Sequence, residues 1–239
     1  MKHKIILCGL MSLAASANAA PLTVFSTDFN GTLATEITPG SASLTGVQGY
    51  AGLGPAGNTF SGNFLRSATG NTVTLTLNNL PTHTAISLDF LFAAIDSLDG
   101  TGTFPSGDYF NVTLDGTSIF RESFANALPS QIQSYVPPAG VELARHVDLG
   151  FGGPGSYYTD SAYYLGDDPV FQNIAHTNSS AVFTFLIEGE GIQSLNDESW
   201  AMDNLNVRVE AVPLPASVWL FASGLFALLK RRRSQPACI

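Results

Sequence analysis

Apolar and polar residues alternate along several stretches in the middle of the chain. In residues 72–77, Val73, Leu75 and Leu77 point one way and the threonines between them point the other. The same period of two runs through residues 84–92, 109–114, 181–189 and 202–209. An apolar face on a period-two segment is typical of a strand with one side against a core. These stretches therefore predict β-strands.

Glycine, proline and Asp-Gly signals separate the predicted strands, and no stretch sustains a helical period. Asp115 and Gly116 favour a type I′ turn, which would join residues 109–114 to 117–124 as a hairpin. Two glycine-rich stretches, residues 40–62 and 129–168, are expected to form loops with some short strands. With roughly eight or more strands in one domain, we predict an all-β, jelly-roll-like antiparallel β-sandwich.

The N-terminus has the features of a secretory signal peptide. A basic start precedes an apolar run at residues 5–15, and small residues follow up to Ala17 and Ala19. This is an A-x-A cleavage pattern, so we expect residues 1–19 to be removed after Ala19. Cys8 lies inside the apolar run and reads as an ordinary residue of it rather than a lipid-attachment site.

Residues 212–229 are uncharged and mostly apolar, and four cations follow them. As a transmembrane helix, this segment would span about 27 Å, close to the hydrocarbon thickness of a bilayer. The cations are expected to stay cytoplasmic, which places residues 20–211 outside the cytoplasmic membrane as an ectodomain. The alternative, a buried C-terminal helix, gives no reason for four consecutive cations.

This order of parts resembles the PEP-CTERM class of sorting signals, in its VPLPA variant. The signal would cover residues 212–233, with a short tail at 234–239. The matching residues are Val212, Pro213, Leu214, Pro215, Ala216, Arg231, Arg232 and Arg233. The resemblance implies export in Gram-negative bacteria, tail cleavage by a membrane-embedded exosortase near the proline motif, and a genome that also encodes exopolysaccharide production. A permanently anchored protein is the alternative.

The ectodomain also resembles one that recurs among PEP-CTERM proteins. The resemblance rests on residues 79–100, 107–120 and 196–207. Many of those proteins read Asp-Ser-Trp-Asp-Gly where this chain has residues 96–100. The resemblance implies no particular activity.

Charge and cysteine placement exclude several classes of function. All 19 Asp and Glu lie between residues 21 and 212, against four Arg and no Lys. Such an acidic surface repels nucleic acid and attracts cations. The two cysteines, Cys8 and Cys238, lie near the chain ends, so the ectodomain has no disulfide framework and no cysteine-based metal site.

Acidic and amide side chains gather at the ends of predicted strands and make a candidate calcium site. They lie after the strand at 84–92, around the start of the last strand, and at the end of the first. The candidate ligands are Asp28, Asn30, Asp96, Asp99, Asp108, Asp197, Glu198, Asp203 and Asn204. Calcium takes six to eight oxygen ligands from flexible loops. Jelly-roll carbohydrate-binding domains commonly share a calcium between neighbouring first and last strands, and residues 27–31 and 200–207 look similar.

Asp203 gives a separate argument for this site. In a regular last strand it would share a face with Leu205, Val207 and Val209. A carboxylate aimed at a core must be paired, hydrogen-bonded or metal-bound. The competing interpretation is that Asp203, like Asp96 and Asp99, forms or caps a turn.

Other side chains suggest weaker candidate sites. Four tyrosines could form a platform for sugar rings, with ordinary loop packing as the competing interpretation: Tyr157, Tyr158, Tyr163 and Tyr164. His83, His146 and His176 fit no metal motif and are expected to be structural. The chain has no G-x-S-x-G elbow, and no carboxylate pair stands out.

The sequence thus predicts a non-enzymatic, exported envelope or matrix protein. We expect a calcium-stabilised β-sandwich that is structural or interacts with glycans. The expected partners are an exosortase, the membrane and exopolysaccharide, without nucleic acid. A secreted hydrolase of extracellular polysaccharide, and a matrix protein without any ligand, are the alternatives.

Overall fold

The computed structural model describes residues 20–102, 107–128, 130–152 and 159–212. Within them, Pro21–Ala211 forms one compact unit. The predicted signal peptide and the sorting signal beyond Val212 lie outside the described residues. No helix in the described ranges combines the length and the apolar character needed to cross a membrane.

The described residues form thirteen β-strands and three short 3₁₀ helices. The elements are β1 (Leu22–Thr27), β2 (Ile37–Thr38), β3 (Ser43–Gly46), η1 (Gln48–Tyr50), β4 (Asn63–Ala68), β5 (Val73–Asn78), β6 (His83–Asp96), β7 (Tyr109–Leu114), β8 (Thr117–Ser123), β9 (Glu142–Val147), β10 (Asp160–Tyr164), η2 (Leu165–Asp167), η3 (Pro169–Phe171), β11 (Ile174–Ala175), β12 (Ser180–Glu188) and β13 (Glu198–Ala211). The five strands predicted from alternation are β5, β6, β7, β12 and β13, and all five are confirmed.

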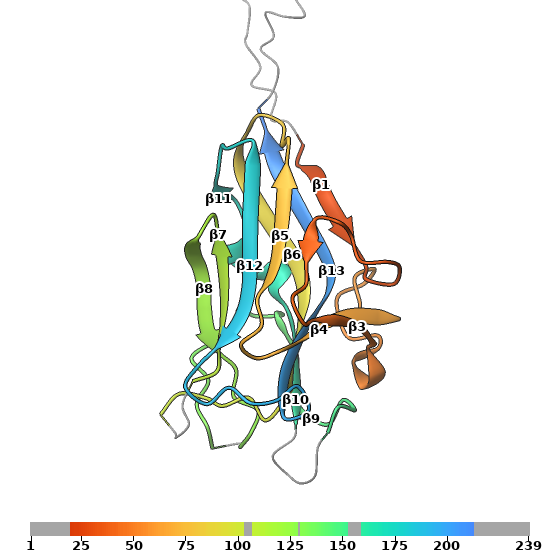
Figure 1. Cartoon of the computed structure of the whole chain (residues 1–239), viewed down its shortest axis with the longest axis vertical. Helices are drawn as coiled ribbons and strands as arrows, with labels where there is room; N and C mark the ends of the chain where they lie inside the picture. The colour runs from red at the N-terminus through yellow and green to blue at the C-terminus, as the bar shows by residue number, and fades with distance from the viewer. Residues whose placement is uncertain (1–19, 103–106, 129, 153–158, 213–239) are drawn as a thin grey trace, which may run out of the picture. The chain divides into compact units, whose positions relative to one another are not determined.

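The strands pair into two antiparallel sheets (Figure 1). The larger runs β3-β4-β13-β6-β10-β9, with β1 also paired to β13 and β11 to β6. The smaller runs β2-β5-β12-β7-β8. The first and last strands lie side by side, as expected, with Phe25 opposite Val207. The predicted antiparallel β-sandwich is therefore confirmed at the level of its two sheets.

The main core lies between the two sheets. Alternate residues of the longer strands point into it, such as Phe183 and Phe185 of β12. Aromatic rings join the sheets: Phe92 of β6 stacks on Phe110 of β7 at 4.3 Å between centroids, and Trp200 of β13 lies 5.3 Å from the same ring. Large buried rings supply much of the apolar area that stabilises a core.

A second apolar cluster covers the outer face of the larger sheet. Tyr50 and Phe60, from the long loop before β4, pack on Leu91, Ala93 and Ile95 of β6. This end of β6 is buried on both faces, so its sequence loses the alternation seen elsewhere. The glycine-rich stretches predicted as loops with short strands contain β3, β9 and β10, which confirms that prediction.

The turn between β7 and β8 follows the predicted type I′ chemistry. Asp115 and Gly116 both have positive φ, 50° and 78°. The Asp115 carboxylate also accepts a hydrogen bond from the Val182 backbone at 2.9 Å. The turn is thereby tied to β12.

The last strand is irregular at Asn204, which overturns one expectation. Asn204 has φ 49°, and the pairing of β13 with β6 shifts register between Asp203 and Asn206. Trp200 and Met202 face the main core before the irregularity, and Leu205 faces it afterwards. An extra residue in a strand reverses which positions face inward. The prediction that Asp203 shares a face with Leu205 was therefore wrong.

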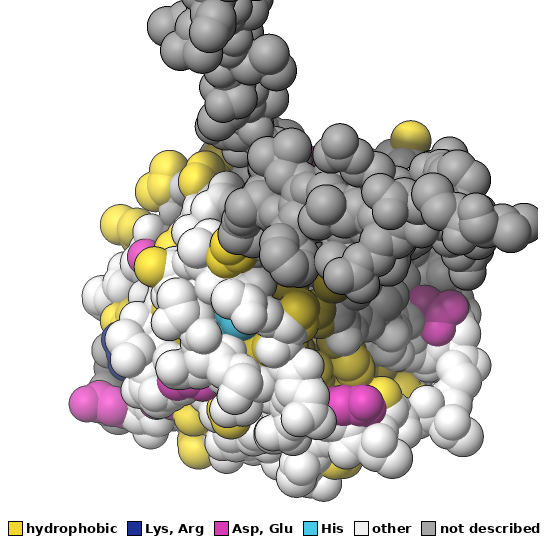
Figure 2. Space-filling view, turned by 90° about the horizontal axis from the view of Figure 1, so that it is seen from above, with side chains coloured by type: hydrophobic (Ala, Val, Ile, Leu, Met, Phe, Trp, Pro, Cys, Tyr) yellow, Lys and Arg dark blue, Asp and Glu magenta, His cyan; other side chains and the backbone are white. Residues whose placement is uncertain are grey.

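Acidic side chains stand at several separate places on the face drawn in Figure 2, and basic side chains only at its edge. This distribution agrees with the excess of acids over arginines in the sequence.

Candidate metal centre

Three acidic side chains converge where β6 ends and β13 begins. The two strands are antiparallel, with Glu198 opposite Asp96, so the start of β13 lies beside the loop that follows β6. Asp99 comes from that loop, and Asp108 from its far end, just before β7. One oxygen of each of Asp99, Asp108 and Glu198 lies within 4.8 Å of the others. We call these three residues the acidic triad.

Two hydrogen bonds between Asp99 and Asp108 close the loop that carries these two triad residues. The Asp108 N–H donates to the Asp99 carbonyl at 3.0 Å, and the Asp99 N–H donates to Asp108 Oδ2. Gly107 has φ +77°, and a Cβ there would meet the Tyr109 ring at 2.1 Å. A glycine is therefore needed at this position to bring Asp108 beside Asp99.

The triad is largely buried and is held by neutral donors. The exposed fractions are 8% for Asp99, 2% for Asp108 and 0% for Glu198. Gln193 donates to both Glu198 oxygens, from its backbone at 3.1 Å and its side chain at 2.7 Å. The Gln131 side chain donates to Asp99 Oδ1 at 2.6 Å.

The arginine ion pairs of the described residues involve other acids. Arg66 pairs with Asp96, Arg121 with Glu188, and Arg208 with Asp89. The triad thus has neutral hydrogen bonds but no arginine ion pair within the described ranges. Three buried carboxylates cannot all be charged without a compensating cation.

Burial and mutual repulsion raise the pKa values of the triad. Burial, followed by repulsion from Asp108, raises the pKa of Glu198 to about 8. Burial raises the pKa of Asp108 to about 6, and that of Asp99 is raised by burial too. Without a bound cation, Glu198 therefore holds a proton at neutral pH.

The donor set of the triad fits a hard cation. All three ligand groups are carboxylates, and oxygen ligands suit Ca²⁺, Mg²⁺ or Mn²⁺ rather than soft metals. A bound divalent cation would replace the proton on Glu198 and offset the repulsion within the triad. The arrangement can therefore hold a metal ion.

Asp96 was predicted to share a site with Asp99 and Asp108, but it turns to the other face of the sheet. Its φ is 63°, and its carboxylate lies 3.7 Å from Arg66. Its backbone N–H donates to the buried Asp160 at 3.1 Å. Burial and then repulsion from Asp160 raise the pKa of Asp96 to about 7. A left-handed residue at the end of β6 thus separates Asp96 from the triad.

Asp197, adjacent to the triad residue Glu198, is bound to Ser97. Its carbonyl oxygen accepts from the Ser97 backbone and hydroxyl, and its Oδ1 accepts from the same hydroxyl at 3.2 Å. These bonds join the start of β13 to the residue after β6. Metal binding by Asp197 stays a prediction.

The acids and amides predicted near the first strand accept backbone hydrogen bonds. Asp203 accepts from Ser61 at 3.1 Å and from its neighbour Asn204 at 2.7 Å. Asn30 Oδ1 accepts from the Asn63 backbone at 2.7 Å. Asp28 Oδ1 accepts from the Asn30 backbone at 3.1 Å. Burial raises the pKa of Asp203 to about 7. Asp28 and Asn204 also line one polar cavity, which Asp203 does not.

The predicted sugar platform is wrong for Tyr163. Its side chain is fully buried, its ring lies 4.9 Å from that of Phe124, and its hydroxyl donates to Gln133 at 3.3 Å. Alternation along β10 turns Tyr163 into the main core. Tyr164 is half-buried and interacts with Asp89, while Tyr157 and Tyr158 lie outside the described residues.

His83 and His176 are structural, as predicted, and form a hydrogen-bonded chain. His83 donates from Nδ1 to the Pro81 carbonyl at 2.6 Å, and its Nε2 bonds His176 Nδ1 at 2.7 Å. His176 Nε2 bonds Asp115 at 3.1 Å. Every ring nitrogen of the pair has a partner, so neither ring is poised to bind a metal.

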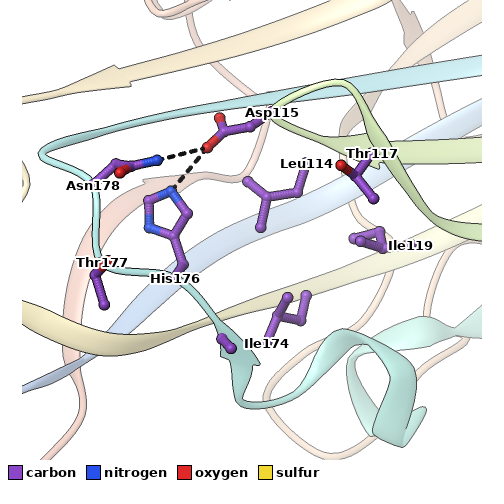
Figure 3. Close-up of a pocket in the computed structure, with 9 residues that line it drawn as sticks. Leu114, Asp115, Thr117, Ile119, Ile174, His176, Thr177 and Asn178 are labelled. Carbon is purple, nitrogen blue, oxygen red and sulfur yellow. Dashed lines mark hydrogen bonds and ion pairs between the residues drawn. The ribbon is translucent and has the colours of Figure 1, made fainter.

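Figure 3 shows the pocket beside this chain, a cavity of about 350 Å³. The Asp115 carboxylate is bonded to both His176 and Asn178, and apolar Ile119 and Ile174 line the other part of the pocket. The Asp115 oxygen that faces His176 also accepts from Asn178 at 3.4 Å. The polar groups of this pocket are thus largely occupied with one another.

Sequence reasoning missed the side chains that hold the triad. Gln131 and Gln193 lie in loops without a recognisable pattern, and their contacts with Asp99 and Glu198 depend on the tertiary fold. The one available signal for Glu198 was its place at the start of the last predicted strand.

Comparison with known proteins gives no family assignment. No family model matches the chain, and no curated protein matches it. Three solved structures show weak similarity. The first is "a novel family GH115 4-O-methyl-alpha-glucuronidase" with specificity for decorated arabinogalactans, at 13% identity and TM-score 0.33, covering 82% of this chain and 19% of that one.

The second is the Agl-KA catalytic domain, at 14% identity and TM-score 0.32, covering 85% of this chain and 30% of that one. The third is the CBM22-2 xylan-binding domain of Paenibacillus barcinonensis Xyn10C, at 11% identity and TM-score 0.32, covering 78% and 99%. The chain spans less than a third of the first two structures. At these TM-scores the similarity establishes neither a shared fold nor a shared function.

Proposed function

We propose that this chain is an exported, jelly-roll-like β-sandwich that binds Ca²⁺ at the acidic triad and serves as a structural or glycan-interacting component of the cell envelope. The triad carries the proposal, because three buried carboxylates within 4.8 Å of one another need a cation if all are charged. Ca²⁺ suits a site formed by an irregular loop. Mg²⁺ demands near-ideal octahedral geometry and keeps several waters, which a largely buried site accommodates poorly.

The position of the triad suggests what the cation does. Asp108 directly precedes β7 of the smaller sheet, whereas Asp99 follows β6 and Glu198 begins β13 of the larger sheet. A cation held by all three residues would link the two sheets at one end of the sandwich. Calcium would therefore act mainly on stability and on the order of this end.

Export and sorting are proposed on the two chain ends, which carry the signal-peptide and VPLPA patterns. Mass spectrometry of protein recovered from the envelope and medium tests this part. A mature chain starting at Ala20 and lacking the residues after Pro215 is the expected result. Full-length chain found folded in the cytosol would contradict export, whereas exported chain with its tail intact would indicate permanent anchoring.

A secreted hydrolase is the second candidate, and one observation favours it. Asp108 and Glu198 are close carboxyl groups with pKa values of about 6 and about 8, and such pairs do acid–base work in glycosidases. Their burial argues against substrate access. Glycan turnover by the purified chain that disappears in Glu198→Gln would establish this candidate and displace the first.

Thermal unfolding of the purified chain tests calcium binding. At a Ca²⁺ concentration of 100 times Kd, we expect the Tm to rise by about 5–10 °C over the chelator-treated protein. Equal Mg²⁺ should give a much smaller shift. Glu198→Gln should lose most of the calcium response.

Glu190→Gln is the matched control, because Glu190 is an exposed acid on the loop after β12. It should retain the full calcium response. A wild-type Tm that is the same in chelator and in Ca²⁺ would contradict the proposal that the chain binds calcium.

A further inference from the structure

Two buried histidines connect the larger sheet to the smaller one, at the end of β6 opposite the triad. His83 is the first residue of β6, and His176 directly follows β11, which pairs with β6. Asp115 belongs to the β7–β8 turn, and its backbone N–H donates to the Val182 carbonyl of β12 at 2.8 Å. The hydrogen-bonded chain from His83 through His176 to Asp115 therefore runs from one sheet to the other.

Both ends of this chain are hydrogen-bond acceptors. The Pro81 carbonyl, 2.6 Å from His83 Nδ1, has no proton to donate. At the other end, His176 Nε2 lies 3.1 Å from Asp115 Oδ2 (Figure 3). The second oxygen of this carboxylate accepts from the Val182 backbone at 2.9 Å, which favours its charged form. The two outer ring nitrogens must therefore each carry a proton.

The two inner nitrogens require a third proton. His83 Nε2 and His176 Nδ1 are 2.7 Å apart, and a hydrogen bond between them needs one proton. Two neutral imidazole rings carry only two protons, so three hydrogen bonds leave the pair with one extra proton and a single positive charge. The exposed fractions of the two residues are 2% and 7%, so water has little access to replace these bonds.

We propose that His83 and His176 share one extra proton from pH 5 to pH 8 and form a pH-sensitive link between the two sheets. A fourth proton would set two N–H groups against each other, and loss of the third would leave one of the three hydrogen bonds unmade. Asp115 is the charged group that contacts the pair in the described residues. On β13, Ala211 lies opposite His83, and the partly exposed Glu210 precedes it.

The proton count gives the link a distinctive dependence on pH. Histidines in an unfolded chain titrate near pH 6.5. Well above this pH the unfolded pair carries two protons and the folded pair three, so stability falls as pH rises. Well below it the unfolded pair carries four protons and the folded pair three, so stability falls as pH decreases. The contribution of the link to stability is therefore greatest near pH 6.5, whether or not the triad binds a metal.

Nitrogen-15 NMR of the purified full chain tests the proton count directly, because protonated and unprotonated ring nitrogens differ in chemical shift. At both pH 5 and pH 8, His83 and His176 together should show three protonated ring nitrogens. Ordinary titration, with nearly four protons at pH 5 and nearly two at pH 8, would overturn the proposal.

Urea unfolding tests the effect on stability. The compared proteins are wild type and the double variant His83→Gln, His176→Gln. The triad is the same in both, so its own pH dependence cancels in the ratio of their folding equilibrium constants. That ratio should be greatest near pH 6.5 and about eightfold lower at pH 5 and at pH 8. A ratio that is constant, or that changes in one direction only, would contradict the link.

His146→Gln is the matched control, because His146 is a partly exposed histidine of β9 outside the pair. Burial, followed by repulsion from Arg145, lowers the pKa of His146. The ratio of wild type to this variant should therefore rise with pH and level off. A maximum near pH 6.5 in this ratio as well would show that the bell shape does not come from the His83–His176 pair, and would overturn the proposal.

Discussion

At the scale of single residues, several carboxyl groups are buried, and they differ in the donors and charges that surround them. Asp203 is held by two backbone donors, and Asp96 lies near Arg66. Glu198 and Asp108 have neutral donors and each other's repulsion. The triad is therefore the place where a cation from solution would change the electrostatic balance most.

The raised pKa values predict that stability without metal falls as pH rises. Glu198 binds its proton more tightly in the folded state, where its pKa is about 8, than in the unfolded chain, near 4.5. The folded state therefore holds more protons between these values, and stability decreases across that window. Asp108 adds the same sign between about 4 and about 6.

Urea unfolding in the presence of chelator checks this prediction. The midpoint should be higher at pH 5 than at pH 8, and excess Ca²⁺ at pH 8 should restore most of the difference. Glu198→Gln should flatten the dependence on pH. A metal-free midpoint that increases from pH 5 to pH 8 would show that these carboxyls are not buried as described.

Sequence reasoning reached the residue types of the triad but not their grouping. Asp99, Asp108 and Glu198 were all expected as ligands because acids cluster at strand ends. Their meeting depends on the antiparallel register that sets Glu198 opposite Asp96, which is a long-range property. The separation of Asp96 depends on one positive φ that the sequence does not signal.

At the scale of elements, alternation predicted the strands that have one buried face. It failed where β6 is buried on both faces, and it had no information on β9 and β10, whose surroundings come from distant loops. The irregularity at Asn204 was also missed, since Asn is only one of several residues that tolerate a left-handed backbone.

The β7–β8 turn gives a test at this scale. Gly116 has φ 78°, and a Cβ there would meet nothing within 4 Å, so Gly116→Ala carries only a backbone penalty. We expect the free energy of unfolding to fall by about 1 kcal/mol. Gly31 has equally open surroundings and no positive φ, so Gly31→Ala should be neutral or slightly stabilising.

Chemical denaturation of both variants measures the difference. Equal stability of Gly116→Ala and Gly31→Ala would mean that the type I′ turn is not the conformation adopted in solution. The comparison needs no ligand, so it tests the fold separately from the metal.

At the scale of the whole molecule, the excess of acidic side chains supports the proposal that the chain binds a cation. The ectodomain carries 19 acids and four arginines, and three of those arginines are in ion pairs with acids outside the triad. An acidic body with few internal cations attracts cations from solution. Residues from both sheets meet at the triad, so a cation bound there would stabilise the packing of one sheet on the other.

The central claim is that a divalent cation replaces a proton at the triad. Calorimetric titration with Ca²⁺ at pH 7, repeated in buffers of different ionisation enthalpy, counts the protons released. Since the pKa of Glu198 is about 8, wild type should release about one proton per chain more than Glu198→Gln. Calcium binding with the same proton release in both proteins, or no binding at all, would contradict the account.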